Sequence, residues 1–353
     1  MAYTVIDDSS KHFQTEIYTG DGSSTQSITN SGNSNLQPDF VWGKLRSGAE
    51  DHWLTNSSVA DKFVNANRSD QTESAFPSGF DFDSDGFSFG SSDATWNSNG
   101  STYVAHSWKG NGGTTSTNTD GDIDTNVQVN SDAGFSIVKY SPPNDTARTI
   151  GHGLGAVPKF IIIKARSRAE NGHVFHYSVG TGGQILDTQT TYNSSSTLGD
   201  AYPTSTVYKL GTDWRMNGAF DYIGYFFANV QGFSKFGTYS GNGDATDGPF
   251  VYLGFKPRFV ILKNTETAAR AWYMYDTARN PGNPNGLKLF ADSSIAESTD
   301  QAISIYSNGF KVRPDGMGSY GTSSVNHSGQ IFCYAAWAES PFVTSTGAPT
   351  TAR

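Results

Sequence analysis

The chain repeats one pattern of residues three times. A proline is followed after two positions by phenylalanine, then directly by a β-branched residue, and a lysine stands six positions after the proline. The three copies are Pro38, Phe40, Val41 and Lys44; Pro158, Phe160, Ile161 and Lys164; and Pro257, Phe259, Val260 and Lys263. Repetition at fixed internal spacing is typical of tandem structural units. It therefore constrains the fold more strongly than any local motif.

Each copy continues through an aromatic cluster and ends on an aromatic segment that we expect to be a closing strand. These segments are residues 103–108, 222–227 and 332–337. The copies predict three modules, at 13–109, 135–228 and 229–342, with an N-terminal segment at 1–12 and a flexible tail at 343–353. Residues 110–134 are expected to form a linker with a possible edge strand. We expect the three modules to pack as separate units.

Composition favours strands over helices. Aromatic residues make up 13% of the chain and glycine accounts for 39 of 353 residues, which suits pleated strands joined by tight turns. The apolar stretches are short, and none keeps a helical period over several turns. The sequence therefore predicts an all-β protein of three tandem β-sandwich, jelly-roll-like modules with little or no helix.

Charge and targeting signals limit the classes of partner. A net charge of −9 opposes binding to nucleic acid and to anionic bilayers, and the charged content of 16% implies a surface of Ser, Thr, Asn and Gly. Residues 1–14 lack a basic segment followed by an apolar one, and no apolar run approaches a membrane span. We therefore expect synthesis in the cytoplasm without a signal peptide. The single cysteine, Cys333, is expected to be a small buried side chain.

The repeated lysine, at positions 44, 164 and 263, ends an apolar segment in every copy. A recurring charge there could be a binding handle. A charge that discourages edge-to-edge strand pairing explains it more economically, so we favour that interpretation.

One acidic stretch has part of the pattern of a calcium loop. Asp81, Asp83 and Asp85 alternate before Gly86, as carboxylates that converge on one cation do. The twelfth position, where a bidentate glutamate belongs, is Ser92. A solvated turn is therefore the favoured interpretation and Ca²⁺ the alternative; no other cofactor is expected.

The loop before each closing strand carries an aromatic residue among polar ones. The candidates for sugar binding are Trp96 with Asn97, Trp214 with Arg215, and Tyr320 with Asn326. An exposed ring can stack on a pyranose face while amide and guanidinium groups bind its hydroxyls. The other interpretation, which we favour, is that each ring folds back as a lid on its own module. No paired carboxylates or nucleophile with an oriented base can be assembled, so no catalytic residues are assigned and the chain is expected not to be an enzyme.

Several stretches of the chain resemble a family of virion proteins. Residues 1–10 (MAYTVIDDSS), 36–42 (LQPDFVW), 149–155 (TIGHGLG), 158–164 (PKFIIIK) and 232–243 (GFSKFGTYSGNG) are similar to virion proteins of marine tailed bacteriophages, cyanophages among them. The resemblance covers nearly the whole chain. It implies a structural component of a phage particle, with other virion proteins as partners.

These observations together predict a non-enzymatic virion structural protein. The favoured role is a tail fibre or appendage component that contacts host surface polysaccharide through many weak sites, as a homo-oligomer and preferably a trimer. The first alternative is a head decoration or capsid fibre protein that binds the capsid lattice. The second is a glycan-degrading tail enzyme.

Overall fold

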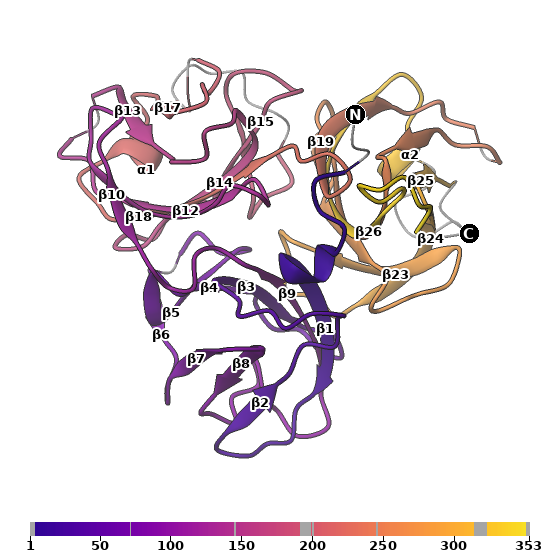
Figure 1. Cartoon of the computed structure of the whole chain (residues 1–353), viewed down its shortest axis with the longest axis horizontal. Helices are drawn as coiled ribbons and strands as arrows, with labels where there is room; N and C mark the ends of the chain where they lie inside the picture. Colours follow the sequence, from indigo (N-terminus) through magenta and orange to yellow (C-terminus); the bar gives the residue numbers. More distant parts are fainter. Residues whose placement is uncertain are drawn as a thin grey trace.

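The chain is built almost entirely of antiparallel strands. The computed structural model describes residues 4–350 except 71, 145, 191–198, 200, 245 and 314–322, and it describes only the backbone at 214, 300, 301, 323 and 324. The helical segments are η1 (Ser9–Lys11), α1 (Trp214–Asn217) and α2 (Ser323–Asn326). The predicted all-β class is thus confirmed. Figure 1 shows three lobes around a common centre, one for each predicted module.

Module 1 consists of a large and a small sheet. The large sheet has the order β1 (Phe13–Thr19), β9 (Thr102–Trp108), β3 (Phe40–Leu45), β4 (Trp53–Asn56), β5 (Val59–Asn65) and β6 (Ser74–Ala75). The small sheet has the order β2 (Gln26–Ile28), β8 (Gly86–Phe89) and β7 (Phe80–Asp83).

Module 2 repeats this plan and recruits the segment between the modules. Its large sheet has the order β10 (Ser116–Asn118), β11 (Thr125–Asn130), β12 (Phe135–Tyr140), β18 (Tyr222–Ala228), β14 (Pro158–Ala165), β15 (His173–His176) and β16 (Gln184–Ile185). The small sheet pairs β13 (Arg148–Gly151) with β17 (Val207–Leu210). Strands β10 and β11 come from residues 110–134 and extend the edge of the large sheet.

Module 3 joins its two sheets into one nearly closed, barrel-like sheet. The order is β19 (Ser234–Ser240), β26 (Ile331–Pro341), β21 (Phe255–Asn264), β22 (Trp272–Asp276), β23 (Asn285–Phe290), β24 (Ser298–Tyr306), β25 (Gly309–Val312) and β20 (Phe250–Tyr252). Its edge strands, β19 and β20, follow each other in sequence and border the open seam. After β26, residues 343–350 form a turn in which Ser345 donates hydrogen bonds to Asp7.

The closing strand occupies the same place in all three modules, between the opening strand and the proline-led strand. The register repeats as well. Trp108 pairs with Phe13 and Phe40, Phe227 pairs with Phe135 and Phe160, and Trp337 pairs with Ser234 and Phe259. The sequence repeat is therefore a repeat of strand order and register.

The last aromatic residues of the three closing strands meet at the centre of the molecule. The ring centroids of Trp108 and Trp337 are 5.3 Å apart, those of Phe227 and Trp337 5.2 Å, and those of Trp108 and Phe227 6.0 Å. All three pairs are edge-on, an arrangement that the ring quadrupoles favour. Phe40, Phe160 and Phe259 each pack against the central ring of their own module. The modules are thus arranged with approximate threefold symmetry around an aromatic centre.

The expectation that the modules pack as separate units is wrong. One hydrophobic core contains residues of all three modules, while modules 1 and 2 also have smaller cores of their own. Strand β14 shows how this arises: Phe160 and Ile162 face the common core, whereas Ile161 and Ile163 face the core of module 2. A strand that is buried on both faces needs a continuous apolar run rather than alternation.

Ion pairs join neighbouring modules at equivalent places. Arg166 of module 2 holds Glu73 of module 1 with two hydrogen bonds, at 2.8 and 2.9 Å. Arg46 of module 1 holds Glu297 of module 3 in the same way, at 3.1 and 2.9 Å. At both contacts, the glutamate N–H also donates to the arginine carbonyl at 2.8 Å. Partial burial and bidentate geometry make such pairs more stabilising than ordinary surface pairs.

The repeated lysines are buried inside the modules. Their strands β3, β14 and β21 are interior strands of the sheets, so the proposed role against edge pairing is wrong. Each ammonium group donates to a carbonyl group at the end of its own strand or in the loop that follows it, and Lys164 also donates to the carbonyl of Arg68 in module 1. The acceptors include Leu45 for Lys44 (2.6 Å), Glu170 for Lys164 (2.7 Å) and Arg270 for Lys263 (2.5 Å). Burial lowers the pKa of Lys44 and of Lys263 to about 8. These lysines hold loops rather than ligands.

The central rings generate a stability prediction. Trp337→Ala removes one member of the central triangle and leaves a cavity, so we expect the free energy of unfolding to fall by about 3–5 kcal/mol. Chemical denaturation would measure it. Tyr306→Ala, at an exposed aromatic residue, is the control and should lower the free energy of unfolding far less. A loss at Trp337 no larger than at Tyr306 would show that the centre is not a stabilising core.

Buried histidines generate a prediction for pH. Burial lowers the pKa of five of them: His106 and His173 to about 3, His152 and His176 to about 4, and His52 well below its usual value. The unfolded chain therefore takes up more protons below pH 6.5. Burial raises the pKa of two carboxyls, Asp187 and Asp292, so these groups stabilise the folded chain as the pH falls. The five histidines outnumber them, so the histidine effect on the free energy of unfolding is the larger one. The free energy of unfolding should fall by several kcal/mol, on the order of one per pH unit or more, between pH 6.5 and 4. Urea denaturation at each pH would measure it, and a flat profile would contradict it.

Candidate functional site

The loop residues that the sequence analysis singled out in module 1 are buried. Trp96 is 3% exposed, and its ring packs against Phe63 and Phe76 at centroid distances of 5.5 and 4.9 Å. Asn97 binds the loop after β1: its Oδ1 accepts from the N–H of Asp21 at 3.0 Å, and its Nδ2 donates to the carbonyl of Ser23 at 3.1 Å. The expectation of an exposed ring is wrong here, and Trp96 is a lid on its own module.

Module 3 uses the same arrangement at Asn326. Its Oδ1 accepts from the N–H of Asn242 at 3.0 Å, and its Nδ2 donates to the carbonyl of Asp244 at 3.1 Å. Asn326 is 1% exposed, so it braces a loop and does not face a ligand. In module 2, Arg215 lies on α1, with its Nε 3.5 Å from Asp213. The Trp214 side chain and Tyr320 lie outside the described residues. Among the described candidates, Trp96, Asn97 and Asn326 are buried and therefore form no binding surface.

The three aspartates of the predicted calcium loop belong to a hairpin. Asp81 and Asp83 lie on β7, Asp85 lies in the turn before Gly86, and the turn has the positive φ (107°) that glycine allows. Asp85 Oδ1 accepts from the N–H of Leu36 at 3.1 Å. Within the described part of the chain, no group of three His, Cys, Asp or Glu side chains is placed to hold a metal ion. The solvated-turn interpretation fits this geometry.

The exposed aromatic side chains gather on module 3. Of the four that are exposed among the described residues, three are Phe250 (47%), Tyr252 (56%) and Tyr306 (38%). Strand β20 is the cause, because its residues alternate: Val251 is buried, whereas Phe250 and Tyr252 point outward. The rings of Phe250 and Tyr306 are in edge-on contact at 6.0 Å. We call Phe250, Tyr252 and Tyr306 the aromatic patch.

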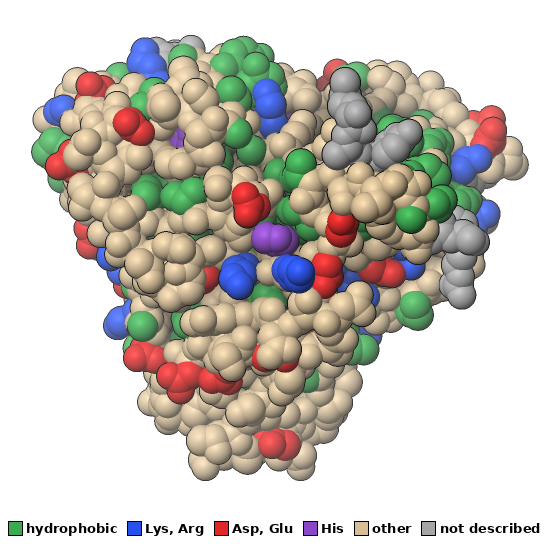
Figure 2. Space-filling model, viewed as in Figure 1, with side chains coloured by type: hydrophobic (Ala, Val, Ile, Leu, Met, Phe, Trp, Pro, Cys, Tyr) green, Lys and Arg blue, Asp and Glu red, His purple; other side chains and the backbone are tan. Residues whose placement is uncertain are grey.

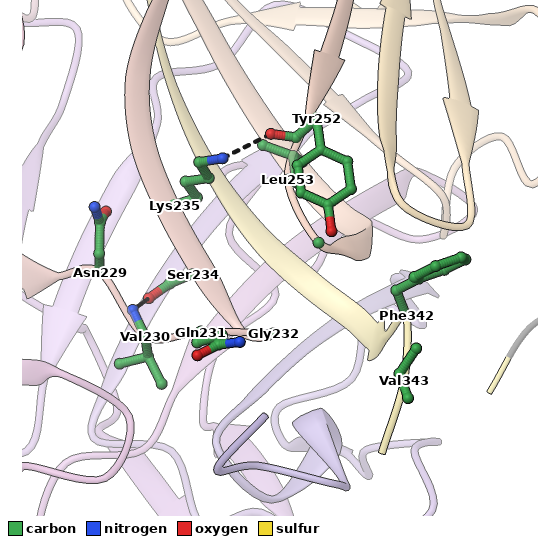
Figure 3. A pocket seen from close by; sticks show the side chains of 11 residues that line it. Asn229, Val230, Gln231, Gly232, Ser234, Lys235, Tyr252, Leu253, Phe342 and Val343 are labelled. Carbon is green, nitrogen blue, oxygen red and sulfur yellow. Dashed lines mark hydrogen bonds between the residues drawn. The ribbon is translucent and has the colours of Figure 1, made fainter. Parts of the chain in front are cut away.

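A groove adjoins the aromatic patch at the open seam of the module 3 sheet. It has a volume of about 460 Å³ and is lined by the junction between modules 2 and 3, by β19, by the end of β20 and by Phe342 and Val343. Tyr252 belongs both to the patch and to the wall of the groove. Figure 3 shows Asn229 and Gln231 of the junction on one side, and Tyr252 and Phe342 on the other.

Lys235 crosses the seam. Its Nζ, on β19, donates to the carbonyl of Tyr252 on β20 at 2.7 Å and lies 5.4 Å from the Tyr252 ring centroid (Figure 3). Burial lowers the pKa of this lysine. The ammonium group therefore ties together two edge strands that no backbone ladder joins, and it places a positive charge in the groove.

The junction wall is held in place by its own hydrogen bonds. Asn229 Oδ1 accepts from the N–H of Phe236 at 2.9 Å, and the side chains of Asn229 and Gln231 are exposed. On the other wall, the N–H of Phe342 donates to the carbonyl of Gly254 at 3.1 Å. The groove thus combines an aromatic face, amide groups and one ammonium group on fixed backbone. A pyranose requires such a combination, because one face is apolar and its edge carries hydroxyls.

This site does not follow from the sequence patterns described above, although the sequence carries a signal for it. Residues 250–255 form one of the short apolar stretches of the sequence. The signal is the placement of aromatic residues at alternate positions, 250 and 252, in a strand too short to be central. It does not identify the outward face, since either alternating set can be the buried one.

The chain belongs to a family defined only as a domain of unknown function, DUF7483, whose model matches residues 8–341. The match spans all three modules, so the family corresponds to the complete three-module unit. No curated protein and no solved structure matches the chain. Both α-helices in the described residues have four residues, far too few to cross a bilayer.

The position of Trp96 generates a prediction. Trp96→Ala should lower the free energy of unfolding by about 3–5 kcal/mol, because the ring fills the core of module 1. Thermal and urea unfolding would measure the loss, with the exposed Tyr202→Ala as the control. Unchanged stability together with lost binding to a polysaccharide would instead restore the sugar-binding role.

Proposed function

We propose that the protein is a non-enzymatic structural component of a phage particle, an appendage that contacts host surface glycans. The aromatic patch beside the seam groove carries this proposal. It is the one place in the described chain where several exposed rings gather, on a surface otherwise rich in small polar residues. The phage assignment rests on the resemblance of the sequence, and the contact with glycans rests on the groove.

The architecture supports a display role. The common core and the inter-module ion pairs make the three modules one rigid unit, so the groove is held at a fixed orientation. Only module 3 carries the aromatic patch among the described residues, so each chain supplies a single site of this kind. Useful affinity for a cell surface would then come from several chains in one particle, as a trimer or larger homo-oligomer provides.

A second candidate function is binding to the capsid lattice as a head decoration protein. The approximate threefold arrangement of the modules favours it, because such a unit can match a threefold position of a lattice with similar contacts from each lobe. Antibody labelling of intact particles would distinguish the two positions, over the head or over the tail.

Glycan binding is testable with the isolated protein. Tyr252→Ala and Phe250→Ala should each weaken binding to host-cell polysaccharide at least about tenfold, or ~1.4 kcal/mol, since each removes a stacking face. The measurement is retention on immobilised polysaccharide and on whole cells, with the protein clustered on beads to restore avidity.

The matched control is Tyr202→Ala, which removes an equally exposed ring from module 2. It should bind as the wild type does. Equal binding by all variants would overturn the groove as a glycan site, and release of reducing sugars by the wild type would favour the enzyme alternative.

A further inference from the structure

A second pocket opens near the centre of one face, between the N-terminal segment, module 1 and the segment that carries β11. It has a volume of about 570 Å³, and its wall includes Lys11 and His12 ahead of module 1, Lys109 at its end and Asn130 on β11. The His12 ring packs edge-on against Phe233 of module 3 at 5.8 Å. Figure 2 shows histidine and basic side chains close together at the centre of this face, with acidic side chains nearby. We call this the axial pocket.

Hydrogen bonds determine which nitrogen of His12 carries the proton. Asn130 Oδ1 accepts from the N–H of Ala133 at 3.1 Å, and Asn130 Nδ2 donates to the carbonyl of Lys109 at 3.0 Å. The amide orientation is therefore fixed, and the second hydrogen on Nδ2 points to His12 Nδ1 at 3.1 Å. His12 Nδ1 must accept this bond, so the neutral ring carries its proton on Nε2.

The two lysines of the axial pocket differ from most cationic side chains of the chain. Arg46, Arg166, Arg279 and Lys256 all form ion pairs, and the repeated lysines bind carbonyl groups. Among the described residues, neither Lys11 nor Lys109 has a hydrogen bond or an ion pair at its ammonium group. Two cationic groups thus line one pocket, in a chain of net charge −9, without a direct ion-pair partner among the described residues.

Asp7 and Asp8 interact electrostatically with Lys11, but among the described residues no carboxylate forms a direct ion pair with Lys11 or Lys109. Asp8, the nearest acidic residue before η1, already accepts hydrogen bonds from Ser10 and Ser34. Asp132 lies in the pocket wall and contributes one negative charge against the two lysines. Serine and asparagine side chains provide much of the remaining lining, so the wall can form hydrogen bonds with a polar ligand.

We propose that the axial pocket binds an oxyanion: a phosphate, a sulfate or the carboxylate of an acidic sugar. Lys11 and Lys109 supply the positive charge, and the Nε2–H of His12 supplies a neutral donor. An oxyanion takes charge-assisted hydrogen bonds from such groups. The site is separate from the seam groove and does not depend on the glycan proposal.

Titration of His12 by NMR tests the proposal on the full chain. Sodium phosphate, sodium sulfate and sodium glucuronate are added at constant ionic strength, balanced with sodium chloride, and the His12 signal is assigned by its loss in His12→Gln. At least one of the three anions should shift the signal saturably and raise the pKa of His12, because a bound anion stabilises the imidazolium form. A response equal to that in chloride alone would overturn the proposal, and the strongest ligand identifies the anion class.

Variants provide a second test. Lys11→Met and Lys109→Met should each lower the affinity for the tightest-binding of the three anions at least about tenfold. Asp132→Asn should raise that affinity. Lys62→Met, an exposed lysine that does not line the pocket, is the control and should bind as the wild type does. Affinity in the two lysine variants equal to that in Lys62→Met would overturn the assignment. The wild-type titration remains decisive if a variant is unstable.

Discussion

Trp108, Phe227 and Trp337 meet edge-on at the centre of the molecule, and the rest of the architecture depends on that contact. Each ring ends a closing strand, and each closing strand lies between the opening and the proline-led strands of its module. Contact among the rings therefore positions three large sheets at once. The proline-led strand β14 is buried on both faces, one toward the common core and one within its module, and it accordingly carries the continuous apolar run from Phe160 to Ile163.

In this chain, the residue types that recur in every copy of the repeat have structural roles rather than binding roles. Lys44, Lys164 and Lys263 suggested a surface charge, yet each ammonium group is buried and donates to a carbonyl group of the loop after its own strand. Asn97 and Asn326 suggested ligand contacts, yet both brace the loop after an opening strand. A buried polar group that satisfies backbone partners is costly to lose, which explains why these groups recur at one position.

Both proposed sites lie where the modules differ from one another. Strands β2, β13 and β20 pair equivalently with β8, β17 and β25, but only β20 carries two outward aromatic residues. The axial pocket likewise depends on residues outside the repeat pattern: His12, its neighbour Lys11 and the lysine that follows β9. The repeated residues form the common framework of the three modules, and the residues that differ between modules form the two proposed sites on its surface.

The repeat, the strand class and the number of modules could be predicted from the sequence, because Pro38, Pro158 and Pro257 introduce the same local pattern and local patterns reflect strand period. Three features were decided by tertiary structure alone: the merging of the modules around one core, the burial of the repeated lysines, and the exposure of Phe250 and Tyr252 rather than Val251. A period of two residues shows that a strand has two faces, but it does not show what covers each face. Only the packing of distant strands decides which side chains remain in contact with water.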